Sequence, residues 1–396
     1  MDGQKHESYE EMVGPIRSSI ERLRLRAACR VNRSIGKLRL SAVKRAPFLL
    51  PAAGLLSDLD GGIRVAVFVL SRNPLVIYMP IGGGRPLNWV AALGRRLASR
   101  PATILLMPNW TLERPAVIEQ LGRDLAWYRE RFPQHALIFL CNTEEERRLV
   151  SGGGGTAIFS NHNLLVREDL FRPLADVPVE FDAVYTGRIS PTKRHHLALD
   201  VERLVHITVS IGELPPSAAR AFIRRLQDRS PLHRIANPIV DGMTTGLPPE
   251  EVNRVYNRAA VGLCLSASEG AMCSSMEYLL AGLPVVSTPS LGGRDVYFDP
   301  EYCMIVEPEP AAIRRAVERV RDRRIPREEI RARTLEKVLP QRRELMGVLS
   351  EVLRRMGGTE PLSEWPFPGP PTHAWQAPVR DHARALLAPA APAGNR

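Results

Sequence analysis

Apolar residues along the chain form two kinds of pattern: short continuous runs, and longer stretches with helical spacing. Together these patterns predict strands that alternate with helices. From residue 61 onward, short runs rich in Val, Ile and Leu, typical of buried strands, are separated by longer stretches with apolar residues three and four positions apart, typical of amphipathic helices. The first series gives strands over 63–70, 75–79, 102–107, 135–141 and 156–160, and helices over 87–99, 115–132 and 143–150. This alternation predicts an α/β domain built on a parallel sheet.

A second series of the same kind follows a segment that fits neither pattern. Residues 171–180 contain two prolines and no helical or strand pattern, so the interdomain linker is placed there. Beyond it, strands around 184 and over 206–211, 235–240, 261–265 and 285–286 alternate with helices over 195–204, 217–228 and 249–259, a short helix before 285, and closing helices over 311–323 and 327–356. A second α/β domain is therefore expected.

Both ends of the chain depart from this alternation. Residues 15–46 carry apolar residues at helical spacing together with ten Lys and Arg and only one acidic residue, Glu21, which predicts a basic amphipathic helix. Its charged face could be solvated while its apolar stripe packs on the body, or it could attach to an anionic membrane, where each cation contributes about 1 kcal/mol. Residues 361–396 are rich in Pro and Ala and are expected to be largely extended or disordered.

Length and composition agree with a globular protein of two domains. At 396 residues the chain exceeds the size at which one hydrophobic core usually keeps growing, and 44% hydrophobic with 24% charged residues is ordinary for globular proteins. The expected divisions are a basic helical extension over 1–60, a first α/β domain over 61–175, a second α/β domain over 176–325, a closing helix over 326–356 and a Pro/Ala-rich tail over 357–396.

Charge, cysteine content and hydropathy argue against nucleic-acid-binding, disulfide-bonded, membrane-spanning and secreted proteins. The net charge of +11 raises the question of nucleic-acid binding, but the excess is concentrated in 15–46, where no aromatic residue interleaves the cations, so no nucleic-acid partner is expected. Five cysteines without a CxxC pair favour reduced thiols. No apolar run reaches the roughly 18–20 residues of a membrane span, and the first residues do not resemble a signal peptide. A cytoplasmic protein is expected. If residues 15–46 bind lipid, the protein would instead lie on the inner face of the membrane.

The most informative stretch, 266–287, places two carboxylates around the start of a short helix. Glu269 comes at the end of a predicted strand, and Glu277 follows about one turn into the helix. The backbone N–H groups at a helix start favour an anionic or oxygen-rich ligand. The residues that would offer them are Gly270, Ala271, Met272, Cys273 and Ser274. Ser274 could donate to phosphate oxygens or simply cap the helix.

Two cations follow the first strand of the second domain. Gly187-Arg188 and Lys193 lie in the turn after that strand, at the sheet edge where open α/β proteins bind ligands. Arg188 and Lys193 are suited to a diphosphate, although on their own they could be surface charges. Combined with Glu269 and Glu277, they call for one ligand with both phosphates and hydroxyl groups, which is a nucleotide sugar.

Candidate groups in the first domain are fewer. Gly83 and Gly84 lie in a glycine turn before a helix, where the backbone could approach a ligand closely or merely reverse direction. His162 follows a strand and could serve as an acid or base toward a second substrate, or be a hydrogen-bonded structural histidine. His195 and His196 are interpreted as a polar helix cap. No Asp-x-Asp lies in the place where a metal-dependent sugar-nucleotide enzyme would need one, so neither a metal nor a cofactor is expected.

Residues 181–320 resemble the C-terminal domain of retaining glycosyltransferases of the GT-B fold, family 4, also called glycosyl transferases group 1. The motifs that carry the resemblance are Tyr185-Thr-Gly-Arg-Ile-Ser-Pro-Thr-Lys193, Glu269-x7-Glu277 and Gly282-Leu-Pro-Val-Val-Ser287 followed by Gly292-Gly293. The first domain is similar through Pro80-Ile-Gly-Gly-Gly84 and 93–98. That loop starts near residue 80 instead of near the N-terminus, so the acceptor half is short.

The resemblance implies two Rossmann-like, doubly wound domains that face a cleft, and a metal-independent hexosyltransferase of glycan biosynthesis. Arg188 and Lys193 would bind the diphosphate of a UDP- or GDP-linked sugar, Glu277 the ribose, and Glu269 the transferred sugar, with the 270–273 amides nearby. The acceptor would be a glycan, a lipid-linked molecule or a small molecule. Two other functions stay open: a nucleotide-sugar epimerase or hydrolase, and a degenerate GT-B protein that acts as a binding or scaffold module.

Overall fold

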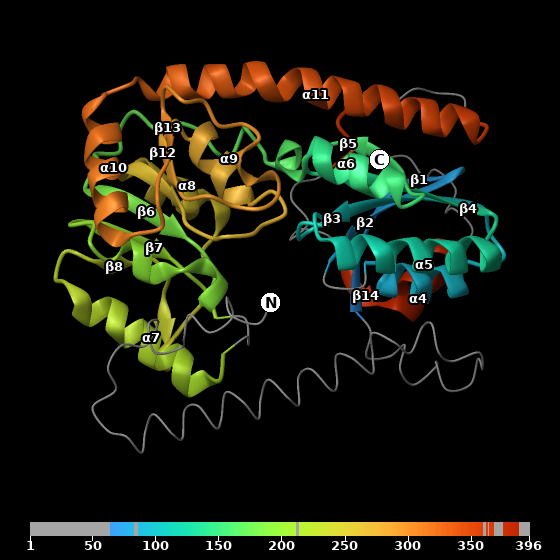
Figure 1. The fold of residues 1–396 in the computed structure, drawn as a ribbon, viewed down its shortest axis with the longest axis horizontal. Coiled ribbons are helices and arrows are strands. Elements are labelled where there is room, and N and C mark those ends of the chain that lie inside the picture. The colour runs from blue at the N-terminus through green and yellow to red at the C-terminus, as the bar shows by residue number, and fades with distance from the viewer. Residues whose placement is uncertain are drawn as a thin grey trace, which may run out of the picture. The chain divides into compact units, whose positions relative to one another are not determined.

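The computed structural model describes residues 64–82, 86–210, 214–358, 362, 364–367 and 375–387, which form two units (Figure 1). Within this part of the chain, the N-terminal unit comprises 64–166, 269–271 and 338–387, and the C-terminal unit comprises 167–268 and 272–337. The basic helix predicted over 15–46 and the glycines Gly83 and Gly84 lie outside the described residues.

The N-terminal unit is built on a six-stranded sheet with the order β14-β1-β2-β3-β4-β5. Its strands are β1 Arg64–Arg72, β2 Leu75–Ile81, β3 Ala102–Pro108, β4 His135–Cys141, β5 Thr156–Phe159 and β14 Trp375–Pro378. Strands β2 to β5 are parallel, as predicted, but β1 pairs with β2 in antiparallel fashion, so the sheet is mixed. Only two residues separate β1 from β2, and a parallel pair needs a crossover of a dozen or more residues.

Helices cover the sheet of the N-terminal unit and complete its core. They are α4 Asn88–Arg96, α5 Pro115–Arg131, α6 Glu144–Gly152, the 3-10 helix η2 His162–Leu165 and the C-terminal α12 Val379–Leu387. Val90 and Leu93 of α4 and its C-cap residue Leu97 are fully buried in the same core as Ile104 of β3 and Phe139 of β4. This packing explains why the 3.6-residue period predicted α4 correctly, and α5 and α6 were predicted from the same period.

Residues 375–387 are more ordered than the composition of the tail predicts. Strand β14 pairs with β1, and α12 buries Val379, Ala383 and Leu386 in the core of the N-terminal unit. The prediction of a largely extended or disordered tail is therefore wrong for 375–387. The three buried positions have the four- and three-residue spacing of an amphipathic helix, but the surrounding Pro and Ala hide it in the overall composition.

The C-terminal unit contains a second six-stranded sheet, entirely parallel, with the order β13-β12-β11-β6-β7-β8. Its strands are β6 Phe181–Thr186, β7 Leu204–Ile207, β8 Arg234–Ile235, β11 Ala259–Cys264, β12 Val285–Ser287 and β13 Cys303–Ile305, and β9 Ile239–Val240 pairs with β10 Met243–Thr244. Its helices are α7 Pro216–Arg229, α8 Pro249–Asn257, α9 Cys273–Leu280 and α10 Pro310–Asp322, with the 3-10 helices η3 Pro191–Lys193, η4 His195–Ala198 and η5 Gly293–Asp295.

Two predicted elements of the C-terminal unit differ in the structure. The helix predicted over 195–204 is only the short η4, because β7 already begins at Leu204, two residues before its predicted start. The strand predicted over 235–240 is divided into β8 and β9, with Pro238 between them. Proline has no N–H to donate to a ladder, so it interrupts the strand pairing.

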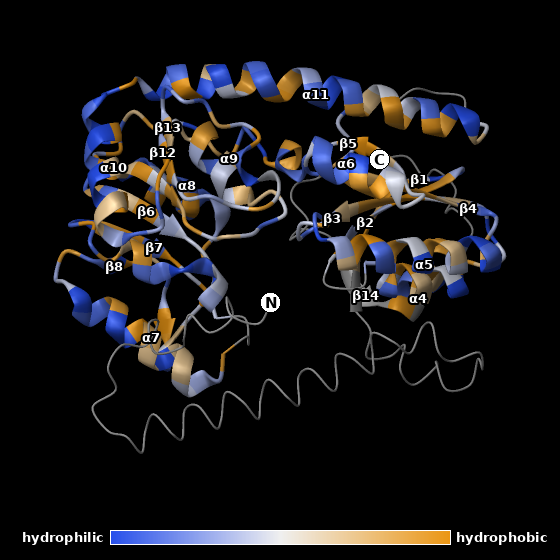
Figure 2. Ribbon diagram, viewed as in Figure 1, coloured by the Kyte–Doolittle hydropathy of each residue, from blue (hydrophilic) through white to orange (hydrophobic). Residues whose placement is uncertain are grey.

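The long helix α11, Arg327–Arg355, contains residues of both units. Its residues up to Lys337 belong to the C-terminal unit, and those from Val338 belong to the N-terminal unit. There Leu345, Leu349 and Leu353 pack against the sheet at four-residue spacing, and Figure 2 shows the interleaved apolar and polar residues of this amphipathic helix.

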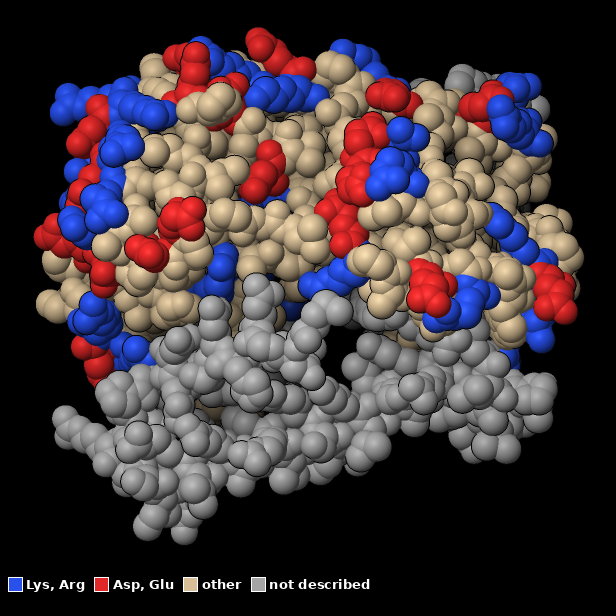
Figure 3. All heavy atoms as spheres, in the orientation of Figure 1, with Lys and Arg blue, Asp and Glu red and all other residues tan. Residues whose placement is uncertain are grey.

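On the described surface, basic and acidic side chains are interspersed, as the face in Figure 3 shows. Many of them form pairs one helical turn apart, such as Arg314 with Glu318 on α10 and Arg354 with Glu351 on α11. No helix among the described residues is long and apolar enough to cross a membrane.

Candidate active site

The carboxyl ends of the strands in the C-terminal sheet bring the predicted site segments together. Strands β6, β11 and β12 are neighbours and parallel, so their carboxyl ends meet at one edge. The Gly187–Lys193 turn follows β6, the segment 266–272 follows β11, and the segment 288–294 follows β12. Edges of this kind are where open α/β sheets bind their ligands.

The turn that carries Arg188 and Lys193 is fixed by buried groups behind it. The Tyr185 hydroxyl on β6 donates a hydrogen bond to the carbonyl of Lys193. The Nε2 of His195 lies 3.0 Å from the Arg188 carbonyl. A Cβ atom at Gly187 would lie 3.4 Å from Cγ of Lys193, so the stem of the lysine side chain passes over the glycine. The two cations are therefore held on one short turn.

His195 has a different environment from the one predicted. It is not a polar cap, because the ring is buried against Tyr185 and Phe222. Burial lowers the pKa of His195 to about 4, so the ring is neutral near pH 7. Neutral imidazole carries one N–H, and placing it on Nε2 lets it donate to the Arg188 carbonyl.

Glu277 lies on α9 and is joined to the end of β6 by two hydroxyl groups. The Thr186 hydroxyl donates to the Tyr256 hydroxyl at 3.2 Å, and Tyr256 donates to Oε2 of Glu277 at 2.6 Å. The backbone N–H of Thr186 donates to the hydroxyl of Tyr278, whose ring packs edge-on against Tyr256. Sequence reasoning missed Tyr256, because it lies on α8 and nothing local marks it as the partner of Glu277.

Burial raises the pKa of Glu277 to about 7, and the hydrogen bond from Tyr256 opposes this rise. The carboxyl group therefore changes charge close to neutral pH. With one oxygen oriented by Tyr256, the ionised group can accept hydrogen bonds from a pair of ligand hydroxyls.

The helix start comes later than predicted. Helix α9 begins at Cys273, so Gly270 and Ala271 precede it and do not open it. Met272 is the N-cap and has a φ of +56°, in the left-handed region that is uncommon for residues other than glycine. Ser274 is buried at the helix start, and both the N–H and the hydroxyl of Ser275 donate to the carbonyl of Met272.

Residues Glu269–Ala271 belong to the N-terminal unit, although they follow β11 in sequence. The side chain of Asn163 donates to the Ala271 carbonyl at 2.8 Å. A Cβ atom at Gly270 would lie 2.8 Å from the backbone of Asn109, so only glycine fits there. The close approach gives Gly270 a packing role in addition to the binding role that the sequence suggests.

His162 is buried near Glu269 in the N-terminal unit. Burial lowers the pKa of His162 to about 4, while its hydrogen bond to the Pro108 backbone and the charge of Glu269 oppose the shift. Its Nδ1 atom has no hydrogen-bond partner among the described residues. The structure thus brings together His162 and Glu269 in one unit, and Arg188, Lys193 and Glu277 in the other.

A buried carboxyl group that shares Asn142 as a partner with His162 was also missed. Glu146 on α6 accepts hydrogen bonds from the N–H groups of Leu112 at 2.7 Å and Asn142 at 2.6 Å, and burial raises its pKa to about 7. The Asn142 side chain accepts from the N–H of His162. A signal was present, because Thr143-x-x-Glu146 has the sequence pattern of a capping box, but this pattern predicts only a helix start, and the Glu146 carboxylate accepts from Asn142 instead of Thr143.

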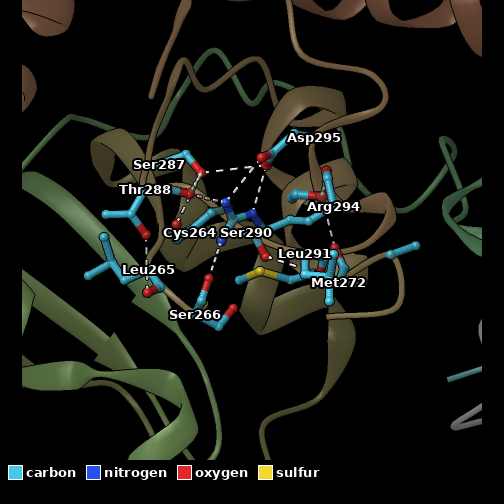
Figure 4. Close-up of polar contacts among 12 residues, drawn as sticks. Cys264, Leu265, Ser266, Met272, Ser287, Thr288, Ser290, Leu291, Arg294 and Asp295 are labelled. Atoms are coloured by element: carbon cyan, nitrogen blue, oxygen red, sulfur yellow. Dashed lines mark hydrogen bonds and ion pairs between the residues drawn. The ribbon is translucent and has the colours of Figure 1, made fainter. Parts of the chain in front are cut away.

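A fully buried arginine ties the segments after β11 and β12 together (Figure 4). Arg294 donates to the carbonyls of Ser266, at 2.6 Å, and Thr288, and it pairs with Asp295 at 2.7 Å. Its own carbonyl accepts from the Ser275 hydroxyl. The Gly292-Gly293 motif pointed to this region, but no sequence pattern marked the arginine as buried. No group of three or more His, Cys, Asp or Glu in the described part of the chain could hold a metal ion.

Comparison with known proteins places this geometry in a known architecture. The chain matches no protein-family model and no curated protein. The structure is similar to that of HepE from Anabaena in complex with UDP, with a TM-score of 0.50 and 14% identity over 69% of this chain and 78% of HepE. The chain has the GT-B fold. The predicted fold class, two Rossmann-like α/β domains, is thereby confirmed.

A second similar structure is the pneumococcal O-GlcNAc transferase GtfA in complex with UDP and GlcNAc. It shares 12% identity over 68% of this chain and 55% of GtfA, with a TM-score of 0.47.

Proposed function

We propose that the chain is a glycosyltransferase of the EC 2.4 class, which moves a sugar from a nucleoside-diphosphate sugar to an acceptor with retention of configuration. One observation carries this proposal. Thr186 and Tyr256 connect the Glu277 carboxyl group to the strand end that leads directly into the Arg188 turn. A ligand that meets both groups needs phosphates next to a pair of hydroxyls, which is the chemistry of a nucleotide sugar.

In this proposal Arg188 and Lys193 bind the diphosphate and stabilise the negative charge that develops on it as the sugar departs. Glu277 accepts hydrogen bonds from the two ribose hydroxyls. The amides at the start of α9, at Cys273 and Ser274, lie near the phosphate or the sugar. The reaction is proposed to need neither a metal nor a cofactor, because fixed cations provide the electrostatic stabilisation.

Glu269 and His162 are proposed to act on the sugar and on the acceptor side. Glu269 binds hydroxyls of the transferred sugar. Because burial lowers the pKa of His162, its imidazole is neutral near pH 7 and can accept a hydrogen bond from a hydroxyl group through Nδ1. The proposed acceptor is a glycan, a lipid-linked molecule or a small molecule.

UDP is the first nucleotide to test, with GDP as the alternative, since the similar HepE structure contains UDP. Replacing Arg188 with alanine is expected to weaken UDP binding about tenfold, because a charge-assisted hydrogen bond to phosphate is lost. Isothermal titration of UDP into both proteins measures the change. Arg319→Ala, which removes an exposed arginine of α10, is the matched control and should leave the affinity unchanged.

Three outcomes would overturn the proposal. If neither UDP nor GDP binds the unmodified chain, the site does not hold a nucleotide. If nucleotide binds but no sugar is released or transferred from any nucleotide sugar, the chain is a binding module. Release of the sugar to water at full rate without any acceptor would instead indicate a hydrolase.

A further inference from the structure

Arg194, next to Lys193, has a backbone conformation that an arginine rarely adopts. Its φ of +48° and ψ of +46° lie in the left-handed region, which is unfavourable for a residue with a Cβ atom and free of strain for glycine. Only three other non-glycine residues in the described part of the chain have a positive φ, and one of them is Met272 at the start of α9. Such outliers tend to gather at functional sites.

The side chain of Arg194 accounts for this conformation. Its Nε donates to the carbonyl of Leu265 at 2.5 Å, just beyond β11, and its Nη2 donates to the hydroxyl of Thr288 at 2.6 Å, just beyond β12. The same Thr288 hydroxyl donates to the Leu265 carbonyl, as Figure 4 shows. One guanidinium group thus joins the turn after β6 to the ends of two neighbouring strands.

A second arginine holds the next carbonyl along the chain. Arg294 donates to Ser266, the residue after Leu265, so two consecutive carbonyls at the end of β11 accept bonds from two different arginines. Arg294 also donates to the Thr288 carbonyl. The backbone where segment 266–272 begins, just after β11, is therefore held by Arg194 at Leu265 and by Arg294 at Ser266.

We propose that Arg194 is a positioning residue of the donor site, which links the diphosphate-binding turn to the start of the segment that carries the sugar-binding residues. A glycine at position 194 would adopt the same backbone without strain but could not make this link. The inference rests on the proposed function, since it concerns how the two halves of that site are aligned.

Arg194→Gly tests this proposal, because it relieves the backbone strain and removes the link in one step. Arg324 provides a matched control: it is also an arginine with a positive φ, +51°, and it is exposed after α10. Arg324→Gly is expected to raise the melting temperature by about 2 °C and to leave UDP binding unchanged. Arg194→Gly is expected to keep the melting temperature of the unmodified chain, but to weaken UDP binding about tenfold by misalignment.

A further measurement separates alignment from a merely structural role. Guanidinium ion at low millimolar concentration should restore part of the UDP affinity of the Arg194→Gly protein and leave the Arg324→Gly protein unchanged. Unaltered UDP affinity in Arg194→Gly, or a melting temperature far below that of the unmodified chain, would overturn the inference. Absence of UDP and GDP binding in the unmodified chain would instead overturn the proposed function, so the two failures are distinguishable.

Discussion

Replacing Arg294 with methionine is expected to lower the free energy of unfolding by about 3–5 kcal/mol, because one partner of a buried ion pair is removed while the other stays. The Arg294 side chain is completely buried, and its partner Asp295 is largely buried. Methionine fills much of the same volume but donates no hydrogen bond. The carbonyls of Ser266 and Thr288 would each lose the hydrogen bond that Arg294 donates.

Urea denaturation of the purified variant measures this loss. Arg319→Met is the matched control, since Arg319 is exposed on α10, and it should change the free energy of unfolding by less than about 0.5 kcal/mol. Replacing both partners, as in Arg294→Met with Asp295→Ala, should recover part of the loss, because no unpaired carboxylate is left behind. A stable Arg294→Met protein would show that Arg294 does not hold the segments together.

The fold could be predicted from the sequence wherever one local period decides the structure. The run from Ala136 to Cys141 is uninterrupted and apolar, and β4 spans His135–Cys141, the bounds that were predicted. Prediction failed where the structure depends on which strands pair, or where the composition of the surrounding segment hides the period. The antiparallel direction of β1 follows from its two-residue connection to β2 at Asn73-Pro74. The spacing of apolar residues within each strand does not reveal this direction. Helix α12 has the correct period, but it lies among prolines and alanines that obscured it.

The candidate site could be predicted only in part for a related reason. The spacing of Glu269 and Glu277 and the turn of Arg188 are local, so the sequence reveals them. Their partners come from distant segments. Tyr256 reaches Glu277 from another helix, and Arg294 reaches Ser266 from 28 residues away. Such contacts depend on the order of strands in the sheet, which the period of a single segment does not specify.

Replacing Glu277 with glutamine is expected to weaken UDP binding about tenfold to a hundredfold at pH 8, because two ribose hydroxyls lose an ionised acceptor. Glutamine retains the shape, and its carbonyl oxygen can still accept the bond from Tyr256. Since burial raises the pKa of Glu277 above that of an exposed glutamate, the folded protein holds this proton more tightly than the unfolded chain. The ionised carboxylate therefore costs stability at pH 8, and Glu277→Gln should melt at a higher temperature without ligand.

The sign of the pH dependence follows from the same shift. Because the pKa of Glu277 is about 7, lowering the pH from 8 to 6 protonates the carboxylate and should weaken UDP binding by the unmodified chain. UDP itself gains a proton near pH 6, so the comparison with Glu277→Gln isolates the contribution of the protein. Glu344→Gln, on the exposed side of α11, should keep both the affinity and the slope.

Tyr256→Phe provides the sharpest form of this experiment. The hydrogen bond from Tyr256 lowers the pKa of Glu277, so its removal should raise that pKa further and move the loss of UDP affinity to a higher pH. A purely structural tyrosine would change stability and leave the midpoint of the pH profile in place. If the profiles of the unmodified chain, Glu277→Gln and Tyr256→Phe coincide, Glu277 does not accept the ribose hydroxyls, and the carboxylate has another role in this fold.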